Sequence, residues 1–156
     1  MLAGIFESDV KGIHETLQAL RRLHQTGDSF RLRRISTWPQ SEKEKSVFPA
    51  HVYDLRLMPE EIARAYRESD LLIGPSHPEE GFGLHVLEAL SLGLPALLSD
   101  TPAHRHIAEN AAEYFKWGEN HDIFRKLKGL LNNPLRLQEL SKMGPVRARR
   151  FNTSKV

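Results

Sequence analysis

The 156 residues are the length of one globular domain, and the 40% hydrophobic and 27% charged residues are typical of a chain that buries a single core. A formal net charge of +2 restricts the setting only loosely, whereas the absence of cysteine excludes disulfides, zinc–thiolate sites and cysteine nucleophiles. No apolar run approaches the roughly 20 residues that span a bilayer, and no signal-like segment opens the chain, so we expect a soluble domain compatible with the cytoplasm.

The first half of the chain alternates strand and helix signals. Short strands are expected at residues 2–6, 31–37 and 51–57. Between the first two, apolar residues recur at helical spacing from Ile13 to Leu23, which predicts an amphipathic helix that ends near Gly27. Residues 38–49 are polar and bracketed by prolines, so we expect them to form a mobile loop.

The second half repeats this alternation. Strands are expected at residues 70–76, 94–99 and 114–117, and closing helices at 122–131 and 134–143. Pro59 and Pro102 suit the first position of a helix, because the N–H that proline lacks has no partner there. The pattern predicts one α/β domain, residues 1–156, with a Rossmann-like, doubly wound, mostly parallel sheet flanked by helices.

The most informative segment, residues 76–100, reads SHPEEGFGLHVLEALSLGLPALLSD. It follows an apolar strand and places a glycine turn before a helix that opens at Leu84 and stops at Gly93. Gly81 and Gly83 lack Cβ atoms and let a bulky anion approach the backbone, while the first helical amides are unpaired and carry the positive end of the dipole. This turn is expected to bind a diphosphate.

Two carboxylates flank the turn. Glu80 lies on it, and Glu88 lies more than one helical turn inside the helix. A carboxylate beside a diphosphate would be repelled unless it faced hydroxyl groups, and sugar or ribose hydroxyls are suitable donors. The two carboxylates are therefore expected to have different tasks.

The segment EGFGLHVLEA, residues 80–89, resembles the donor-binding signature EGFGLxxxEA of retaining, GT-B-fold glycosyltransferases of family 4, also called group 1. The likeness extends over almost the whole chain. It includes VKGIHETLQALRRL at 10–23, PEEIARAYRESDLLIGPS at 59–76 and GLPALLSDTPAHRHI at 93–107.

The resemblance implies roles for single residues. Glu80 would contact the transferred sugar, and Glu88 would hold the ribose hydroxyls. The turn residues Gly81, Phe82, Gly83 and Leu84 would bind the donor, with the amides of Gly83 and Leu84 on the diphosphate. Lys11, in the KG pair, would stabilise the leaving diphosphate together with the helix amides. Glu80 and Lys11 are thus the expected catalytic residues, with no metal or cofactor required.

The resemblance is incomplete at the positively charged residues that the family uses to bind the donor. The family usually has an arginine just after the first strand, where this chain has Gly4, Ile5 and Phe6, so Lys11 is the only cation kept. Arg56, after the third expected strand, is a candidate substitute. Leu55 replaces a glycine that the family often has at that bend.

A complete enzyme of this fold has two such domains. The resemblance therefore implies that the chain is the C-terminal half, without the N-terminal acceptor domain, as an expressed fragment or a naturally short product. The parent enzyme would transfer a sugar from a nucleotide diphosphate sugar, UDP- or GDP-linked, to an acceptor with retention, and could touch a membrane surface. The isolated chain is expected to bind donor weakly and to transfer little or nothing.

Other readings of the sequence remain open. The chain could be a noncatalytic nucleotide-sugar-binding module, or a basic nucleic-acid-binding domain. The arginines that would support the latter are Arg31, Arg33, Arg34, Arg147, Arg149 and Arg150. Because no aromatic residues are interleaved with them, these arginines are expected to lie on solvated faces, or at an interface with the absent domain or a membrane. No nucleic acid partner is expected. His104 and His106 are expected on a helix, where residues two apart diverge, and His85 on a helix surface.

Overall fold

Residues 1–4, 6–8 and 11–152 are described in the computed structural model. They form a six-stranded sheet of order β3-β2-β1-β4-β5-β6, in which each neighbouring pair is parallel. The strands are β1 Leu2–Ala3, β2 Arg33–Ser36, β3 Val52–Leu55, β4 Leu72–Gly74, β5 Ala96–Ser99 and β6 Glu113–Phe115. The order reverses between β1 and β4, and ligands of such sheets bind outside the carboxyl ends of the strands at that point.

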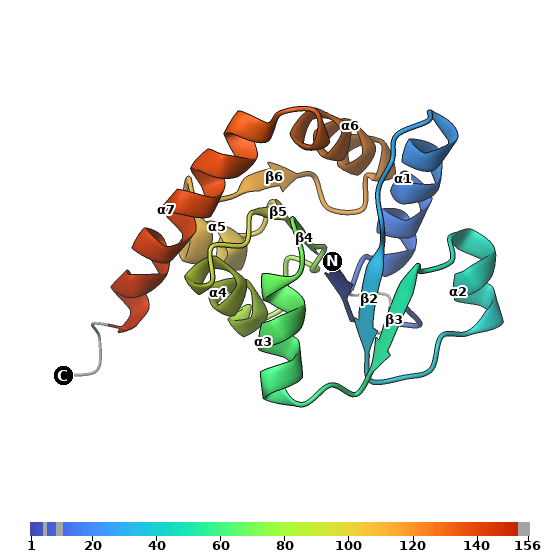
Figure 1. The fold of residues 1–156 in the computed structure, drawn as a ribbon, viewed down its shortest axis with the longest axis horizontal. Coiled ribbons are helices and arrows are strands. Elements are labelled where there is room, and N and C mark those ends of the chain that lie inside the picture. Colours follow the sequence, from blue (N-terminus) through green and yellow to red (C-terminus); the bar gives the residue numbers. More distant parts are fainter. Residues whose placement is uncertain (5, 9–10, 153–156) are drawn as a thin grey trace.

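Helices cover both faces of the sheet (Figure 1). They are α1 Ile13–Gln25, α2 Glu42–Val47, α3 Pro59–Arg67, α4 Leu84–Ser91, α5 Pro102–Ala108, α6 Asn120–Leu131 and α7 Pro134–Asn152. One buried apolar cluster joins the sheet to α3, α4, α5 and the end of α7, and a second joins it to α1 and α6. This three-layer arrangement confirms the predicted Rossmann-like α/β class.

The central strand β1 is the shortest. Leu2 is fully buried and pairs with Arg34 of β2 on one side and with Ile73 of β4 on the other. The predicted strand 2–6 is therefore too long, because Gly4 adopts a positive φ of 133°, which ends the extended conformation. Residue 5 lies outside the described residues.

The prediction of a mobile loop at residues 38–49 is wrong, because the segment contains α2. The Ser41 side chain accepts a hydrogen bond from the Glu44 amide at 3.1 Å and caps the helix. The Glu44 carboxylate accepts a hydrogen bond from the Arg34 Nε at 2.7 Å, and the two residues are 1% and 0% exposed. A buried ion pair therefore attaches α2 to the sheet. Because this attachment is polar, the sequence of the segment shows no apolar periodicity that would have predicted the helix.

The last helix is also longer than predicted. Instead of ending at residue 143, α7 continues past Pro145 to Asn152. A Cβ on Gly144 would lie 2.8 Å from the Leu90 carbonyl oxygen, which shows how closely α7 packs on α4. This packing compensates for the helix bond that proline removes. Residues 153–156 lie outside the described part of the chain.

Candidate functional site

The turn between β4 and α4 lies at the carboxyl end of β4, beside the point where the strand order reverses. Gly83 is buried and directly precedes α4, and a Cβ there would contact the His104 ring at 3.7 Å. Gly81 is exposed, and a Cβ there would meet nothing within 4 Å. A Cβ on Gly83 would thus make ordinary van der Waals contacts under the turn, whereas Gly81 leaves the outer side of the turn open.

The amides at the start of α4 are only partly engaged. Leu84 donates its amide hydrogen to the Phe82 carbonyl at 3.0 Å, within the turn itself. The amides of Gly83 and His85 have no hydrogen-bond partner among the described residues. Of the two amides predicted to contact a diphosphate, Gly83 is therefore available, and Leu84 has to exchange its present partner.

The two predicted catalytic residues are in contact. Lys11, on the loop that leads from β1 to α1, forms an ion pair through its Nζ with the Oε1 of Glu80. The side chains are 39% and 21% exposed, so the pair remains accessible to solvent. Gly12, next to Lys11, has a φ of 58°, and a Cβ there would lie 3.0 Å from the Cβ of Pro75. The Lys11 loop therefore packs directly on the chain that leaves β4.

Glu88 lies on α4, away from the ion pair. It is exposed, and the Tyr66 hydroxyl donates to its Oε2 at 3.5 Å. Burial of the ring and the Glu88 carboxylate both raise the pKa of Tyr66, so the phenol stays protonated as a donor. Phe82 and Leu84 are half or more exposed at the start of the helix. The two predicted carboxylates thus occupy separate positions, and their different tasks stay predictions.

A buried polar network that the sequence analysis did not assign lies under this turn. Ser99, at the end of β5, accepts a hydrogen bond from the Ser76 amide at 2.9 Å and donates to the Ser76 carbonyl at 2.7 Å. His104 Nδ1 lies 2.8 Å from the Ser99 carbonyl oxygen, so Nδ1 carries a proton. Desolvation lowers the pKa of His104. His104 is buried and His106 exposed on α5, which confirms that the two side chains diverge.

Replacing Ser99 by alanine should destabilise the domain by about 1–3 kcal/mol, because the buried Ser76 amide would lose its acceptor. Urea unfolding followed by circular dichroism measures the loss. Ser91→Ala is a matched control, since its hydroxyl also bonds a carbonyl, that of Glu88, but is exposed. Equal effects of the two substitutions would contradict a special role for the buried network.

His85, on the first turn of α4, is half-buried. Burial is the main cause that lowers its pKa to about 4, and the charges of His104 and Lys11 add to it while Glu80 opposes it. The side chain therefore lies on a helix surface, as expected, and close enough to Lys11 and Glu80 for their charges to affect its pKa.

Arg56, the candidate substitute for the family arginine, is engaged elsewhere. Its Nε donates to the Thr37 carbonyl at 3.0 Å, and within the described residues it forms no hydrogen bond or ion pair with Lys11 or Glu80. A different guanidinium lies nearer the end of β1. Arg34 donates to the carbonyls of Leu2 at 3.1 Å and Gly4 at 3.0 Å, but its charge is neutralised by Glu44.

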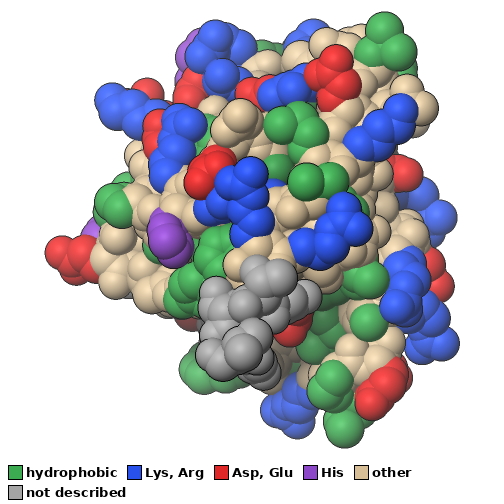
Figure 2. Space-filling view, turned by 90° about the vertical axis from the view of Figure 1, so that its left-hand side faces the viewer, with side chains coloured by type: hydrophobic (Ala, Val, Ile, Leu, Met, Phe, Trp, Pro, Cys, Tyr) green, Lys and Arg blue, Asp and Glu red, His purple; other side chains and the backbone are tan. Residues whose placement is uncertain are grey.

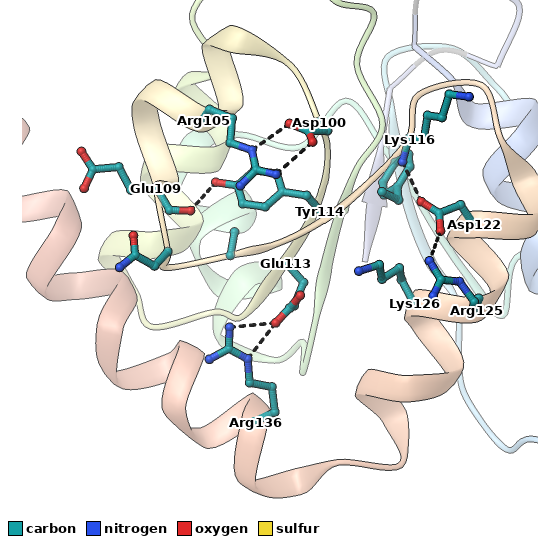
Figure 3. Close-up of a pocket in the computed structure, with 13 residues that line it drawn as sticks. Asp100, Arg105, Glu109, Glu113, Tyr114, Lys116, Asp122, Arg125, Lys126 and Arg136 are labelled. Carbon is teal, nitrogen blue, oxygen red and sulfur yellow. Dashed lines mark hydrogen bonds and ion pairs between the residues drawn. The ribbon is translucent and has the colours of Figure 1, made fainter.

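A cavity of about 630 Å³ lies along β6, apart from this turn, and contains none of the predicted site residues (Figure 3). Several of its charged side chains pair with each other. Arg105 bonds Asp100 at 2.7 and 2.9 Å, and Arg136 bonds Glu113 at 2.7 Å. Because the predicted site residues lie at the Gly83 turn and not in this cavity, we place the candidate site at the turn.

The model of a known family matches residues 6–147 and is described as glycosyl transferases group 1. The chain belongs to this family. The family predicted from residues 80–89 is thereby confirmed. Among the described residues of this group 1 glycosyltransferase, no helix is both long enough and apolar enough to cross a membrane.

Two curated relatives are glycosyltransferases. D-inositol 3-phosphate glycosyltransferase of Rhodococcus erythropolis is 32% identical over 96 residues, which cover 60% of this chain and 22% of the relative. Sulfoquinovosyl transferase of Arabidopsis thaliana is 29% identical over 130 residues, covering 78% of this chain and 25% of the relative. The chain thus spans about a quarter of the length of these relatives.

Solved structures share the fold. Sucrose-phosphate synthase from Thermosynechococcus elongatus superposes with a TM-score of 0.80 at 18% identity, covering 96% of this chain and 40% of that one. The catalytic domain of cholesterol-alpha-glucosyltransferase from Helicobacter pylori superposes with a TM-score of 0.73 at 16% identity, covering 96% and 97%. These likenesses confirm the Rossmann-like sheet of a GT-B glycosyltransferase.

Proposed function

We propose that this chain is the donor-binding half of a glycosyltransferase that uses a nucleotide diphosphate sugar, UDP- or GDP-linked, and retains the anomeric configuration. The observation that carries the proposal is the Lys11–Glu80 pair beside the Gly83 turn, at the carboxyl end of β4. Ligands of doubly wound sheets bind at this position, and a helix entrance there favours phosphate.

In this proposal each group has a defined task. Lys11 and the amides of Gly83 and Leu84 stabilise the negative charge that develops on the departing diphosphate. Glu80 accepts hydrogen bonds from the sugar hydroxyls, and Glu88 from those of the ribose. Because Lys11 is paired with Glu80 in this structure, donor binding has to loosen that pair and give each charge a new partner.

The acceptor would be bound by a second domain across the cleft, so the chain alone would transfer little or no sugar. Exposed apolar side chains at this edge of the sheet support the proposal that a second domain covers it. They follow the carboxyl ends of β2, β3 and β4 and are Trp38, Leu55, Met58, Phe82 and Leu84, between 42% and 62% exposed. Sugar transfer by the purified chain would contradict this part of the proposal.

We expect one of UDP and GDP to bind saturably in a calorimetric titration. Glu88→Ala should weaken that binding about 10- to 100-fold, since a hydrogen bond to a charged group contributes about 1.5–3 kcal/mol. Glu60→Ala, an exposed carboxylate on α3, is the control and should leave the affinity unchanged. Binding of neither nucleotide, or an unaltered affinity in Glu88→Ala, would overturn the assignment.

The nucleic-acid alternative is disfavoured by how the arginines are used. Arg33 pairs with Asp54 and Glu68, Arg34 is buried, and Arg147 pairs with Glu109. On the face that carries α7, Lys and Arg side chains lie among Asp, Glu and hydrophobic ones rather than in one continuous patch (Figure 2). Steeply salt-dependent binding of DNA or RNA would restore this alternative.

A further inference from the structure

The candidate donor site has few uncommitted positive charges. Lys11 is already paired with Glu80, and Arg56 is bonded to the Thr37 carbonyl. The diphosphate of a nucleotide sugar carries two negative charges, whereas the helix entrance supplies the equivalent of about half a positive charge. A further cation would therefore strengthen binding, and the groups beside the turn can be searched for one.

His85 occupies the position where such a cation is needed. It is the second residue of α4, and its own amide and that of Gly83 are unpaired among the described residues. The half-buried imidazole makes no hydrogen bond within the described chain, yet neither ring nitrogen belongs to the buried, unpartnered atoms. The ring therefore has free donor and acceptor capacity that is open to solvent beside the turn.

Three titratable groups from three different segments act on this ring. They are Lys11 from the loop before α1, Glu80 from the turn and His104 from α5. With the site empty, desolvation lowers the pKa of His85 to about 4, so the ring is neutral at neutral pH. A bound diphosphate adds negative charge next to the same ring and raises its pKa.

On the basis of the proposed function, we propose that His85 takes up one proton from solvent when a nucleotide diphosphate sugar binds, and donates a hydrogen bond to the diphosphate as a second cation beside Lys11. Donor affinity is then coupled to pH. Protonation favours the bound state, so binding tightens as the pH falls below the pKa of His85 in the complex and is weakest well above it.

His104 is not equivalent to His85. Its Nδ1–H is held by the Ser99 carbonyl at 2.8 Å, and the side chain is 2% exposed beneath Gly83. A charge there would be desolvated without a counterion in contact. His104 therefore supports the turn in its neutral form, and the proton enters at His85.

The test titrates the chain with UDP-glucose and GDP-mannose between pH 8 and pH 5.5. Both diphosphates are esterified at each end and do not titrate in this range, so a pH dependence reports the protein. We expect the affinity of the bound donor to rise about tenfold over this range, which requires donor binding to raise the pKa of His85 from about 4 to its ordinary value of about 6.5. Calorimetry in buffers of different ionisation enthalpy should show uptake of a proton.

Variants separate the possible outcomes. H85Q should remove most of the pH dependence, and H85K should bind at pH 8 about as tightly as the wild type at pH 5.5. His106→Gln, an exposed histidine on α5, is the control and should keep the wild-type dependence. Circular dichroism confirms that each variant is folded.

Donor binding with the same pH dependence in H85Q as in the wild type would overturn the role of His85 and leave the proposed function standing. Binding without any pH dependence in the wild type would do the same. Failure of both nucleotide sugars to bind at every pH would overturn the proposed function and this inference with it.

Discussion

Replacing Arg34 by methionine should destabilise the domain by about 3–5 kcal/mol. Arg34 and Glu44 are 0% and 1% exposed, and their 2.7 Å contact is the charged part of a network that also satisfies the carbonyls of Leu2 and Gly4. Removal of the guanidinium leaves the Glu44 carboxylate buried without a counterion. Urea unfolding at neutral pH measures the difference in the free energy of unfolding.

Two variants control this experiment. Lys45→Met breaks the exposed pair with Glu42 on the same helix α2, and should cost at most about 1 kcal/mol. The double variant Arg34→Met/Glu44→Met should recover most of the lost stability, because no lone buried charge remains. An Arg34→Met protein as stable as Lys45→Met would show that the buried pair does not hold α2 on the sheet.

Gly12→Ala should cost about 2–5 kcal/mol. The φ of 58° is left-handed, which costs an L-residue about 1–2 kcal/mol, and the new Cβ would lie 3.0 Å from the Pro75 Cβ, where overpacking adds about 1–3 kcal/mol. A shift of the Lys11 loop that relieves the contact would disturb the adjacent Lys11–Glu80 pair. We therefore expect weaker nucleotide binding together with the lower stability, measured by calorimetry and urea unfolding on the same protein.

Gly27→Ala separates the cost of the left-handed backbone from the cost of the close contact. Gly27 has a φ of 86°, but a Cβ there would meet nothing within 4 Å. Its substitution should cost only the conformational part and leave nucleotide binding unaffected. If Gly12→Ala cost no more than Gly27→Ala, the contact between the Lys11 loop and Pro75 would be unimportant.

Much of the fold could be predicted from the sequence because its signals are local. Apolar runs that end at Gly74–Pro75 or Ser99–Asp100 indicate buried parallel strands, and Pro59 and Pro102 begin helices as expected. The glycine turn before α4 followed from the same reasoning. The roles of Glu80, Glu88 and the turn residues stay predictions until a nucleotide is titrated.

Other features depend on contacts between distant residues. Helix α2 owes its position to Glu44 reaching Arg34 on β2, and neither residue alone predicts burial. In α7, Gly144 and Pro145 resemble a helix end in isolation, but packing on α4 continues the helix. The Ser99–His104 network under the turn likewise arises only when β4, β5 and α5 come together.

The brevity of β1 also bears on how the domain assembles. In the described sheet, β1 lies between the pair β2–β3 and the group β4–β5–β6, and the pairing of Leu2 with Ile73 closes a long stretch of chain. Such closure is slow, because its entropy is lost before the contacts form. Glu80 and Glu88 belong to the later group and Lys11 follows β1. A partly folded chain with only that group formed would hold Glu80 without its cation, so the Lys11–Glu80 pair forms only when β1 joins the sheet.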